Sequence, residues 1–226
     1  MKLTFNINYD TVFGEEVLLN IVETDSKGAK KSSQFRMNNR DGKHWWYELN
    51  RKEATLNTSL DYYYSVDCDW ADSRHEWLTE THRLELSAVK GREYTVYDHW
   101  ADVPEDSYLY SSAFTECVNR RPLPSIRPSA YDKTVRLIVR APQLRTFEQL
   151  AVVGKPKSMG AWDVFKALPM YEHNYNEWIV DLNVETLDGE VLEFKFAALN
   201  TADKQHPLWE TGMNREIHLP EIKNGE

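Results

Sequence analysis

The chain alternates apolar and polar residues over many short stretches, which is the pattern of half-buried β-strands. In the first stretch, Leu3, Phe5 and Ile7 alternate with the polar residues Thr4 and Asn6. One side of such a strand faces a core and the other faces water. Similar runs recur between turn residues, and we predict strands at 3–8, 16–21, 45–49, 60–66, 83–86, 135–140, 149–153, 178–182, 192–197 and 215–219.

Helical periodicity is weak throughout the sequence. No stretch carries an apolar stripe of 3.6-residue period over three turns, and only residues 111–119 are a short helix candidate. Short strands separated by turns are typical of β-sandwiches. We therefore predict an all-β fold with two immunoglobulin-like antiparallel β-sandwich domains in tandem.

Two domains are predicted because landmark residues recur at nearly constant spacing. Glu15 and Trp45 have counterparts 133 residues later, at Glu148 and Trp178. The spacing is 132 for the segment 62–64 and its counterpart 194–196, and for Trp77 with Arg83 and their counterparts Trp209 with Arg215. We predict sandwiches at 1–90 and 133–226, joined by a connector at 91–132.

The connector combines two compositions. Residues 120–128 are rich in Pro and Arg, which favours an extended segment. Residues 94–118 hold several Tyr and Trp side chains, so we expect this part to pack against one or both sandwiches.

Charge and composition exclude several classes of function. The 226-residue chain has a net charge of -9, which opposes nucleic-acid binding. No run of about 18 apolar residues is present, so we expect neither a membrane span nor a secretory signal. Cys68 and Cys117 stand alone in the sequence, and we expect reduced thiols and a cytoplasmic protein.

Motifs for metals, nucleotides and catalysis are missing from the sequence. No CxxC pair, HExxH or GxxxxGK occurs, and Asp67, Asp69 and Asp72 lack the remaining spacing of a calcium loop. We predict no cofactor, no metal site and no catalytic residue in this chain.

The candidate chemistry lies in aromatic residues placed among turns. Trp162 and Trp209 both occur in turn-rich sequence, where an indole needs either burial or a ligand. With Lys195 and Asn214 nearby, the two rings suit a sugar, which offers apolar C–H faces and hydroxyl groups. The alternatives are that Trp162 belongs to the core, and that Lys195, between Phe194 and Phe196, merely marks the solvent face of a strand.

The order of these residues resembles the starch-binding domains of carbohydrate-binding module family 20. The resemblance lies in Gly160-Ala161-Trp162, in Phe194-Lys195-Phe196 and in the run from Trp209 to Arg215. It implies a sugar site formed by Trp162, Lys195 and Trp209, with Glu210 and Asn214 as hydrogen-bonding neighbours.

The resemblance also implies a second sugar site built from tyrosines. Tyr171 and Phe147 stand near the expected positions, with Thr146 as an alternative to Phe147 and Tyr175 as a substitute. Trp178, on a predicted strand, is consistent with either a core or a surface position.

The first domain resembles a degenerate copy of the same module. Residues 11–17 match the opening signature of the family, but Tyr63 stands in the position of Lys195 and His82 in that of Asn214. A polar turn at 25–31 replaces the Trp162 segment, which leaves Trp77 and Trp70 as platform candidates. We expect weak or no sugar binding there.

The tandem arrangement, with Asp98-His99-Trp100 and Ser112-Ala113-Phe114, resembles the start of a 4-alpha-glucanotransferase of glycoside hydrolase family 77. This implies a non-catalytic region that binds α-1,4-glucan or maltooligosaccharide next to a C-terminal catalytic domain. The alternative is a protein-interaction or regulatory module, or a structural spacer.

Overall fold

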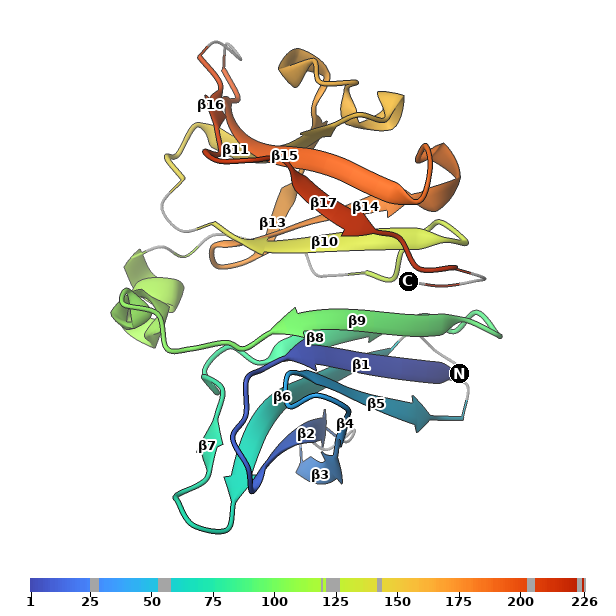
Figure 1. Cartoon of the computed structure of the whole chain (residues 1–226). Helices are drawn as coiled ribbons and strands as arrows, with labels where there is room; N and C mark the ends of the chain where they lie inside the picture. The colour runs from blue at the N-terminus through green and yellow to red at the C-terminus, as the bar shows by residue number, and fades with distance from the viewer. Residues whose placement is uncertain are drawn as a thin grey trace. The chain divides into compact units, whose positions relative to one another are not determined.

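The computed structural model describes residues 1–24, 29–52, 58–118, 120, 127–141, 144–202, 206–222 and 225. They fall into two compact units, Met1–Arg120 and Arg121–Glu226, and both consist mainly of β-strands (Figure 1). The predicted all-β fold is confirmed.

The first unit contains two sheets. One has the strand order β4-β5-β1-β9, and the other has the order β3-β2-β6-β7 with β8 also paired to β6. The strands are β1 (Lys2–Asn8), β2 (Glu15–Thr24), β3 (Lys30–Arg36), β4 (Asn38–Asn39), β5 (His44–Asn50), β6 (Thr58–Cys68), β7 (Arg74–His75), β8 (His82–Leu86) and β9 (Glu93–His99).

The last strand of the first sheet, β9, pairs in parallel with β1, whereas the sequence predicted a fully antiparallel arrangement. β9 pairs in parallel with β1 over its whole length, from Lys2 opposite Glu93 to Asn8 opposite His99. Residues 93–99 therefore belong to the first sheet, although the sequence analysis assigned them to the connector.

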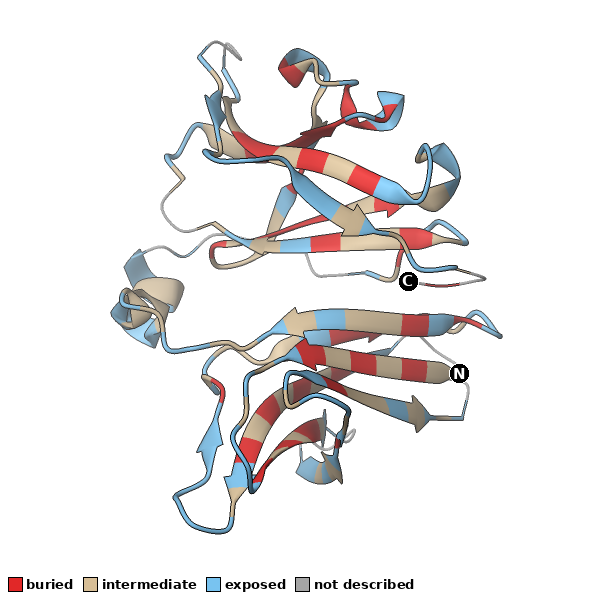
Figure 2. Ribbon diagram, in the orientation of Figure 1, coloured by how far each residue is buried: buried red, intermediate tan, exposed pale blue. Residues whose placement is uncertain are grey.

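The core of the first unit lies between its two sheets. Leu3, Phe5 and Ile7 of β1 meet side chains of β2 and β6, including Leu19 and the fully buried Tyr64. Figure 2 shows the resulting alternation of buried and partly exposed residues along β1. Burial of this apolar surface is the main stabilising term of the sandwich.

Two short helical segments follow β9. They are η1 (Ser107–Tyr110), a 3₁₀ helix, and η2 (Ala113–Val118), a π-helix that falls within the helix predicted at 111–119. Asn119 lies outside the described residues. Tyr110 packs edge-on against Trp77 at 4.9 Å, so this aromatic segment packs against the sandwich within the first unit.

The second unit also contains two sheets, of order β10-β14-β13 and β12-β11-β15-β16 with β17 also paired to β15. Its strands are β10 (Thr134–Arg140), β11 (Glu148–Gly154), β12 (Leu168–Pro169), β13 (Tyr171–Asn174), β14 (Glu177–Asn183), β15 (Val191–Asn200), β16 (Leu208–Trp209) and β17 (Arg215–His218). Three 3₁₀ turns connect them: η3 (Lys157–Met159), η4 (Val164–Lys166) and η5 (Val184–Thr186).

The two units share strand pairing as well as strand order. β1 pairs with β5 from Lys2–Asn50 to Asn8–His44, and β10 pairs with β14 from Thr134–Asn183 to Arg140–Glu177. These positions are related by the spacings of 132 and 133 seen in the sequence. The second unit also has a parallel contact at the corresponding position, a β-bridge between Lys133 and Gly225.

The described part of the chain contains no helix long and apolar enough to cross a membrane. The same residues hold no group of three or more His, Cys, Asp or Glu side chains that could bind a metal ion. Cys68 and Cys117 are free thiols.

Candidate functional site

Strand β15 is the base of the candidate site. Phe194 and Phe196 point into the core of the second unit and are at most 8% exposed. Because side chains alternate along a strand, Lys195 and Ala197 lie on the opposite, outer face of the sheet. Lys195 is half-buried there.

Trp209 stands on the same outer face. It belongs to the two-residue strand β16 and lies directly opposite Ala197. Residues directly opposite each other in an antiparallel pair project to the same side. The indole is 40% exposed and does not belong to the core cluster, so its ring remains accessible to a ligand.

Lys195 fixes the segment that carries Trp209. Its ammonium group donates to the backbone oxygens of Gly212, at 2.6 Å, and Glu210, at 3.3 Å. Since an ammonium group has three hydrogens, these bonds leave one for a hydroxyl group of a ligand.

Trp162 lies on a strained turn that is hydrogen-bonded to the end of β11. Gly160, Ala161 and Trp162 all have positive φ angles, of 87°, 50° and 65°. Such angles are costly for residues other than glycine and persist only where the surroundings enforce them. The Trp162 N–H donates to the oxygen of Gly154 at 3.0 Å, and Gly154 pairs with Phe194, next to Lys195.

Gly160 allows this turn to close. A Cβ atom at this position would lie 2.7 Å from the oxygen of Asp163 and 2.9 Å from the carbonyl of Lys166. The Asp163 carboxylate accepts a hydrogen bond from the Phe165 N–H and pairs with Lys166 at 2.8 Å. The bond from Lys166 holds the pKa of the Asp163 carboxyl below its usual range. The half-buried Trp162 indole is thus carried by a fixed loop.

Asn214 and Glu210 occupy different sides of the segment. The Asn214 amide donates to Glu193 at 2.6 Å, and Glu193 shares the outer face with Lys195. Glu210 follows Trp209 and points away from it, where its carboxylate accepts two bonds from Arg215 at 3.0 and 3.1 Å. Asn214 therefore borders the candidate surface, whereas Glu210 supports it from behind.

The residues of the second candidate site are close in the fold but less well assembled. Phe147 is 66% exposed and Tyr171 is 38% exposed. A hydrogen bond of 2.9 Å from Gln149 to the Met170 oxygen links the segments that carry them. Tyr175 is half-buried in the turn between β13 and β14, and Trp178 is a core residue, 8% exposed.

Strand register corrects the correspondence between the two units. His75 lies opposite Ser65 as Trp209 lies opposite Ala197, so the counterpart of Trp209 is His75 and not Trp77. His82 lies opposite Tyr62 as Arg215 lies opposite Phe194. His82 therefore corresponds to Arg215, whereas the sequence comparison aligned it with Asn214 and aligned Arg83 with Arg215.

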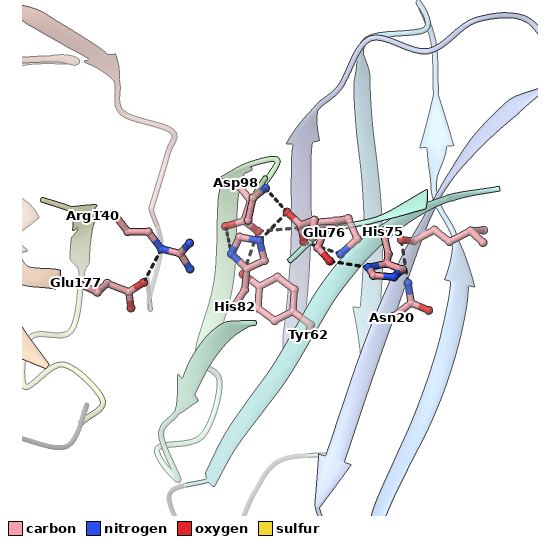
Figure 3. Close-up of polar contacts among 11 residues, drawn as sticks. Asn20, Tyr62, His75, Glu76, His82, Asp98, Arg140 and Glu177 are labelled. Atoms are coloured by element: carbon pink, nitrogen blue, oxygen red, sulfur yellow. Dashed lines mark hydrogen bonds and ion pairs between the residues drawn. The ribbon is translucent and has the colours of Figure 1, made fainter. Parts of the chain in front are cut away.

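In the first unit the counterpart of the Glu210–Arg215 pair, behind the outer face, is a closed polar network that includes Glu76 and His82 (Figure 3). His82 pairs with the buried Glu76 at 3.0 Å and lies 3.7 Å from Asp98, which also accepts from the hydroxyls of Tyr62 and Tyr64. Burial raises the pKa of Asp98. The Ala101 N–H donates to Glu76 at 2.8 Å, so the chain leaving β9 covers this carboxylate.

The other platform candidates of the first unit are separated from each other. Trp77 packs against Tyr110, whereas Trp70 is 64% exposed beside Gly14. The polar segment predicted as a turn at 25–31 forms strand β3 from Lys30 onward, and residues 25–28 lie outside the described part. Tyr63 keeps the register of Lys195, opposite Asn20.

Sequence reasoning missed the role of Arg215. The guanidinium lies 5.3 Å from the centre of the Phe196 ring and binds Glu210, so it joins the β15 core to the loop after Trp209. The recurring Trp–x5–Arg spacing, from Trp77 to Arg83 and from Trp209 to Arg215, was visible in the sequence, but the direction of Glu210 depends on the strand register.

Comparison with known proteins gives a family match for the second unit. The family model described as "Starch binding domain", of carbohydrate-binding module family 20, matches residues 133–226. The match covers the second unit and supports a starch-binding domain there, which is a non-catalytic type of module.

Individual relatives are more distant. Glucoamylase-1 of Arthroderma benhamiae is 28% identical over 104 residues, which are 44% of this chain and 16% of that protein. The family 20 module of a maltotetraose-forming amylase from Pseudomonas saccharophila is 19% identical, with 41% of this chain and 96% of that chain covered and a TM-score of 0.35. A glycoside hydrolase family 15 glucoamylase from Hypocrea jecorina is 23% identical over 46% of this chain and 17% of its own, with a TM-score of 0.32. This chain thus spans less than a fifth of the length of either glucoamylase.

Proposed function

We propose that the second unit binds α-1,4-glucan through Trp162, Lys195 and Trp209. The observation that carries the proposal is the placement of Lys195 and Trp209 on the outer face of β15 and β16, with the turn that carries Trp162 tied to the neighbouring strand β11. Trp162 is tied to Gly154 opposite Phe194, Lys195 follows on the strand, and Trp209 lies opposite Ala197. The match of residues 133–226 to the starch-binding family supports the same ligand.

The physical basis is stacking with a few directed hydrogen bonds. Removing the apolar face of a sugar from water against an indole contributes about 25 cal/mol per Å². Each hydrogen bond from Lys195 or Asn214 to a hydroxyl adds a net contribution of about 1 kcal/mol. After the loss of translational and rotational freedom, we expect a dissociation constant between about 1 µM and 1 mM.

The finer proposal is that this chain is the glucan-binding region of a 4-alpha-glucanotransferase whose catalytic domain lies outside these residues. The shared strand register of the two units supports tandem modules, and Asp98-His99-Trp100 adds the resemblance to glycoside hydrolase family 77. An antibody against this chain should then detect a polypeptide well above 26.5 kDa that carries glucanotransferase activity. A band at 26.5 kDa alone would contradict this part of the proposal.

A partner-binding or spacer role is the second candidate, and one observation favours it for the first unit. The outer face that corresponds to the sugar site carries Tyr63 in the position of Lys195 and His75 in that of Trp209, so it lacks both the cation and the indole. We therefore assign no sugar site to that region of the first unit.

Calorimetric titration with maltoheptaose tests the main proposal. Wild-type protein should bind saturably, and Trp162→Ala and Trp209→Ala should each weaken binding at least about tenfold, a loss of about 1.4 kcal/mol. Trp70→Ala is the matched control, because it removes an exposed indole from the other unit. Absence of binding by the wild type up to about 10 mM, or unchanged binding in both site variants, would exclude the proposal.

A further inference from the structure

A second aromatic surface lies on the outer face of the first sheet. Trp45 and Trp46 are adjacent on β5, and Trp45 is 6% exposed within the core. Trp46 therefore points to the outer side of the sheet, where it is half-buried. It lies opposite Asn6 on β1 and Asn38 on β4.

Trp46 forms one wall of an open cavity with charged neighbours. The cavity measures about 390 Å³ and is lined by Arg40, Asp41, His44 and Trp46. The Arg40 guanidinium lies over the indole, 5.2 Å from its centre. The cavity thus combines an aromatic face with a cationic donor, an anionic acceptor and an imidazole.

The turn that carries these side chains is held by hydrogen bonds from several directions. The Asp41 carboxylate accepts from the N–H groups of Lys43, at 3.0 Å, and His44, at 2.9 Å, and also pairs with the His44 ring. The Gly42 oxygen accepts from the N–H and the hydroxyl of Thr11, each at 2.9 Å. This arrangement reduces the entropy lost when a ligand binds.

Charge indicates what kind of ligand fits. Asp41 is held ionised, because the His44 N–H and the other donors keep the pKa of its carboxyl well below the usual range. With Arg40 opposite, the fixed charges of the cavity cancel, which favours a neutral ligand over a phosphate or an ammonium group. The net charge of -9 further opposes a nucleic acid, whose bases could also stack on Trp46.

The exposed surface extends beyond the cavity along one row of the sheet. Trp46 lies opposite Asn6, and Asn6 lies opposite Tyr97 of β9, which is 66% exposed. β5 and β9 flank β1, so their backbones are about 10 Å apart. Two aromatic side chains at that separation, with an amide between them, suit an oligosaccharide better than a single sugar.

We infer that the outer face of the first sheet, from the Arg40–Trp46 cavity to Tyr97, is an additional binding site for a neutral oligosaccharide. The inference rests on the proposed function in taking this ligand to be the same α-glucan. Trp46 would stack on one ring, with the Arg40 guanidinium moving aside to donate to hydroxyl groups. Asp41 would accept from hydroxyl groups, and Tyr97 would contact a neighbouring ring.

Indole N–H signals in ¹H–¹⁵N NMR spectra test this site separately from the site of the second unit. The test uses the full chain carrying Trp162→Ala and Trp209→Ala, titrated with maltoheptaose. We expect the Trp46 signal, assigned with Trp46→Ala, to shift saturably with a dissociation constant of about 0.1 to 10 mM. Adding Trp46→Ala should weaken the remaining binding at least about tenfold, Tyr97→Ala should weaken it less, and Trp70→Ala should leave it unchanged.

Outcomes for the two sites are distinguishable. If the Trp162 and Trp209 signals of the wild type shift but the Trp46 signal does not move up to about 10 mM, only this inference is wrong. If the Trp162 and Trp209 signals stay unchanged, the proposed function is wrong, whatever Trp46 does. Should Trp46→Ala impair folding, judged from the melting temperature, Trp46→Phe replaces it and must still weaken binding for the inference to stand.

Discussion

Trp162 is presented by backbone geometry that few residues can adopt. Three consecutive positive φ angles, at Gly160, Ala161 and Trp162, turn the chain sharply after η3. Two of these residues are not glycine, so the loop stores strain that the β11 pairing and the Asp163 bonds must offset. Strain of this kind is common where a side chain is held ready for a ligand.

Replacement of Gly160 by Ala should therefore be costly for both stability and binding. The added Cβ would meet backbone atoms at 2.7 and 2.9 Å, so we expect a loss of about 2 to 4 kcal/mol in the free energy of unfolding, measured with urea. Gly189→Ala is the matched control, since Gly189 has a φ of 85° but open space around it. Equal losses in the two variants would show that the close contacts at Gly160 do not matter.

Lys195 illustrates how a site residue can act in two ways. Its bonds to Gly212 and Glu210 hold the segment after Trp209, and its remaining hydrogen can reach a ligand. The sequence places a lysine between two phenylalanines, which indicates the face of the strand and nothing more. The backbone partners became visible only with the register of β15 and β16.

Among the elements, the turn before β2 makes the stability of the first unit depend on pH. The Val12 N–H donates to Glu15 at 3.0 Å, and Arg74 pairs with the same carboxylate at 2.7 Å. The Val12 bond, with the help of Arg74, holds the pKa of Glu15 below its ordinary value of 4.5, although burial opposes the shift. The folded protein thus binds a proton at Glu15 less readily than the unfolded chain does.

It follows that the stabilisation from Glu15 is fully present above pH 4.5 and is lost as the pH falls through the lower folded-state pKa. Between about pH 6 and pH 3, the melting temperature of Glu15→Gln should fall less than that of the wild type. Glu16→Gln, which removes a more exposed carboxylate paired with Arg36, controls for net charge. A fall as steep in Glu15→Gln as in the wild type would contradict this account.

The predicted strands were those whose own residues alternate clearly. β15 carries Leu192, Phe194 and Phe196 on one side, so its face and position follow from sequence alone. β3 has the sequence KKSSQFR, with no apolar face apart from Phe35, and it forms because β2 supplies a partner. Pairing context of this kind outweighs intrinsic preference in β-sheets.

β9 was missed for a different reason. Tyr94 and Val96 do alternate with polar residues, but the segment precedes the Pro-rich stretch, and the sequence analysis therefore assigned it to the connector. Similarly, the doublet Trp45-Trp46 does not reveal which ring faces outward. The candidate residues Trp162, Lys195 and Trp209 could be chosen from their order, whereas the cavity at Trp46 required the pairing of β1, β4 and β5.

For the whole molecule, the two hydrophobic cores are separate. One cluster draws its buried residues from Leu3 to Tyr94, and the other from Leu137 to Phe196. We expect Phe196→Ala to lower the free energy of unfolding of the second unit by about 3 to 5 kcal/mol. Tyr64→Ala should act in the same way on the first unit.

Differential scanning calorimetry can separate these effects, because each variant should shift only one transition. Maltoheptaose, added at saturation, should raise the transition that Phe196→Ala lowers. A single transition displaced equally by both variants would mean that the two units unfold as one cooperative body.

The parallel closure of the first sheet has a consequence for the synthesis of the chain. β1 is made before its partner β9, which lies 91 residues later in the chain, from Lys2 to Glu93. At a translation rate of about 5 to 20 residues per second, one edge of β1 stays unpaired for roughly 5 to 20 seconds. An open strand edge is a template for wrong pairing between chains. A nascent chain that stalls before residue 93 therefore exposes an edge of β1 that β9 covers in the folded protein.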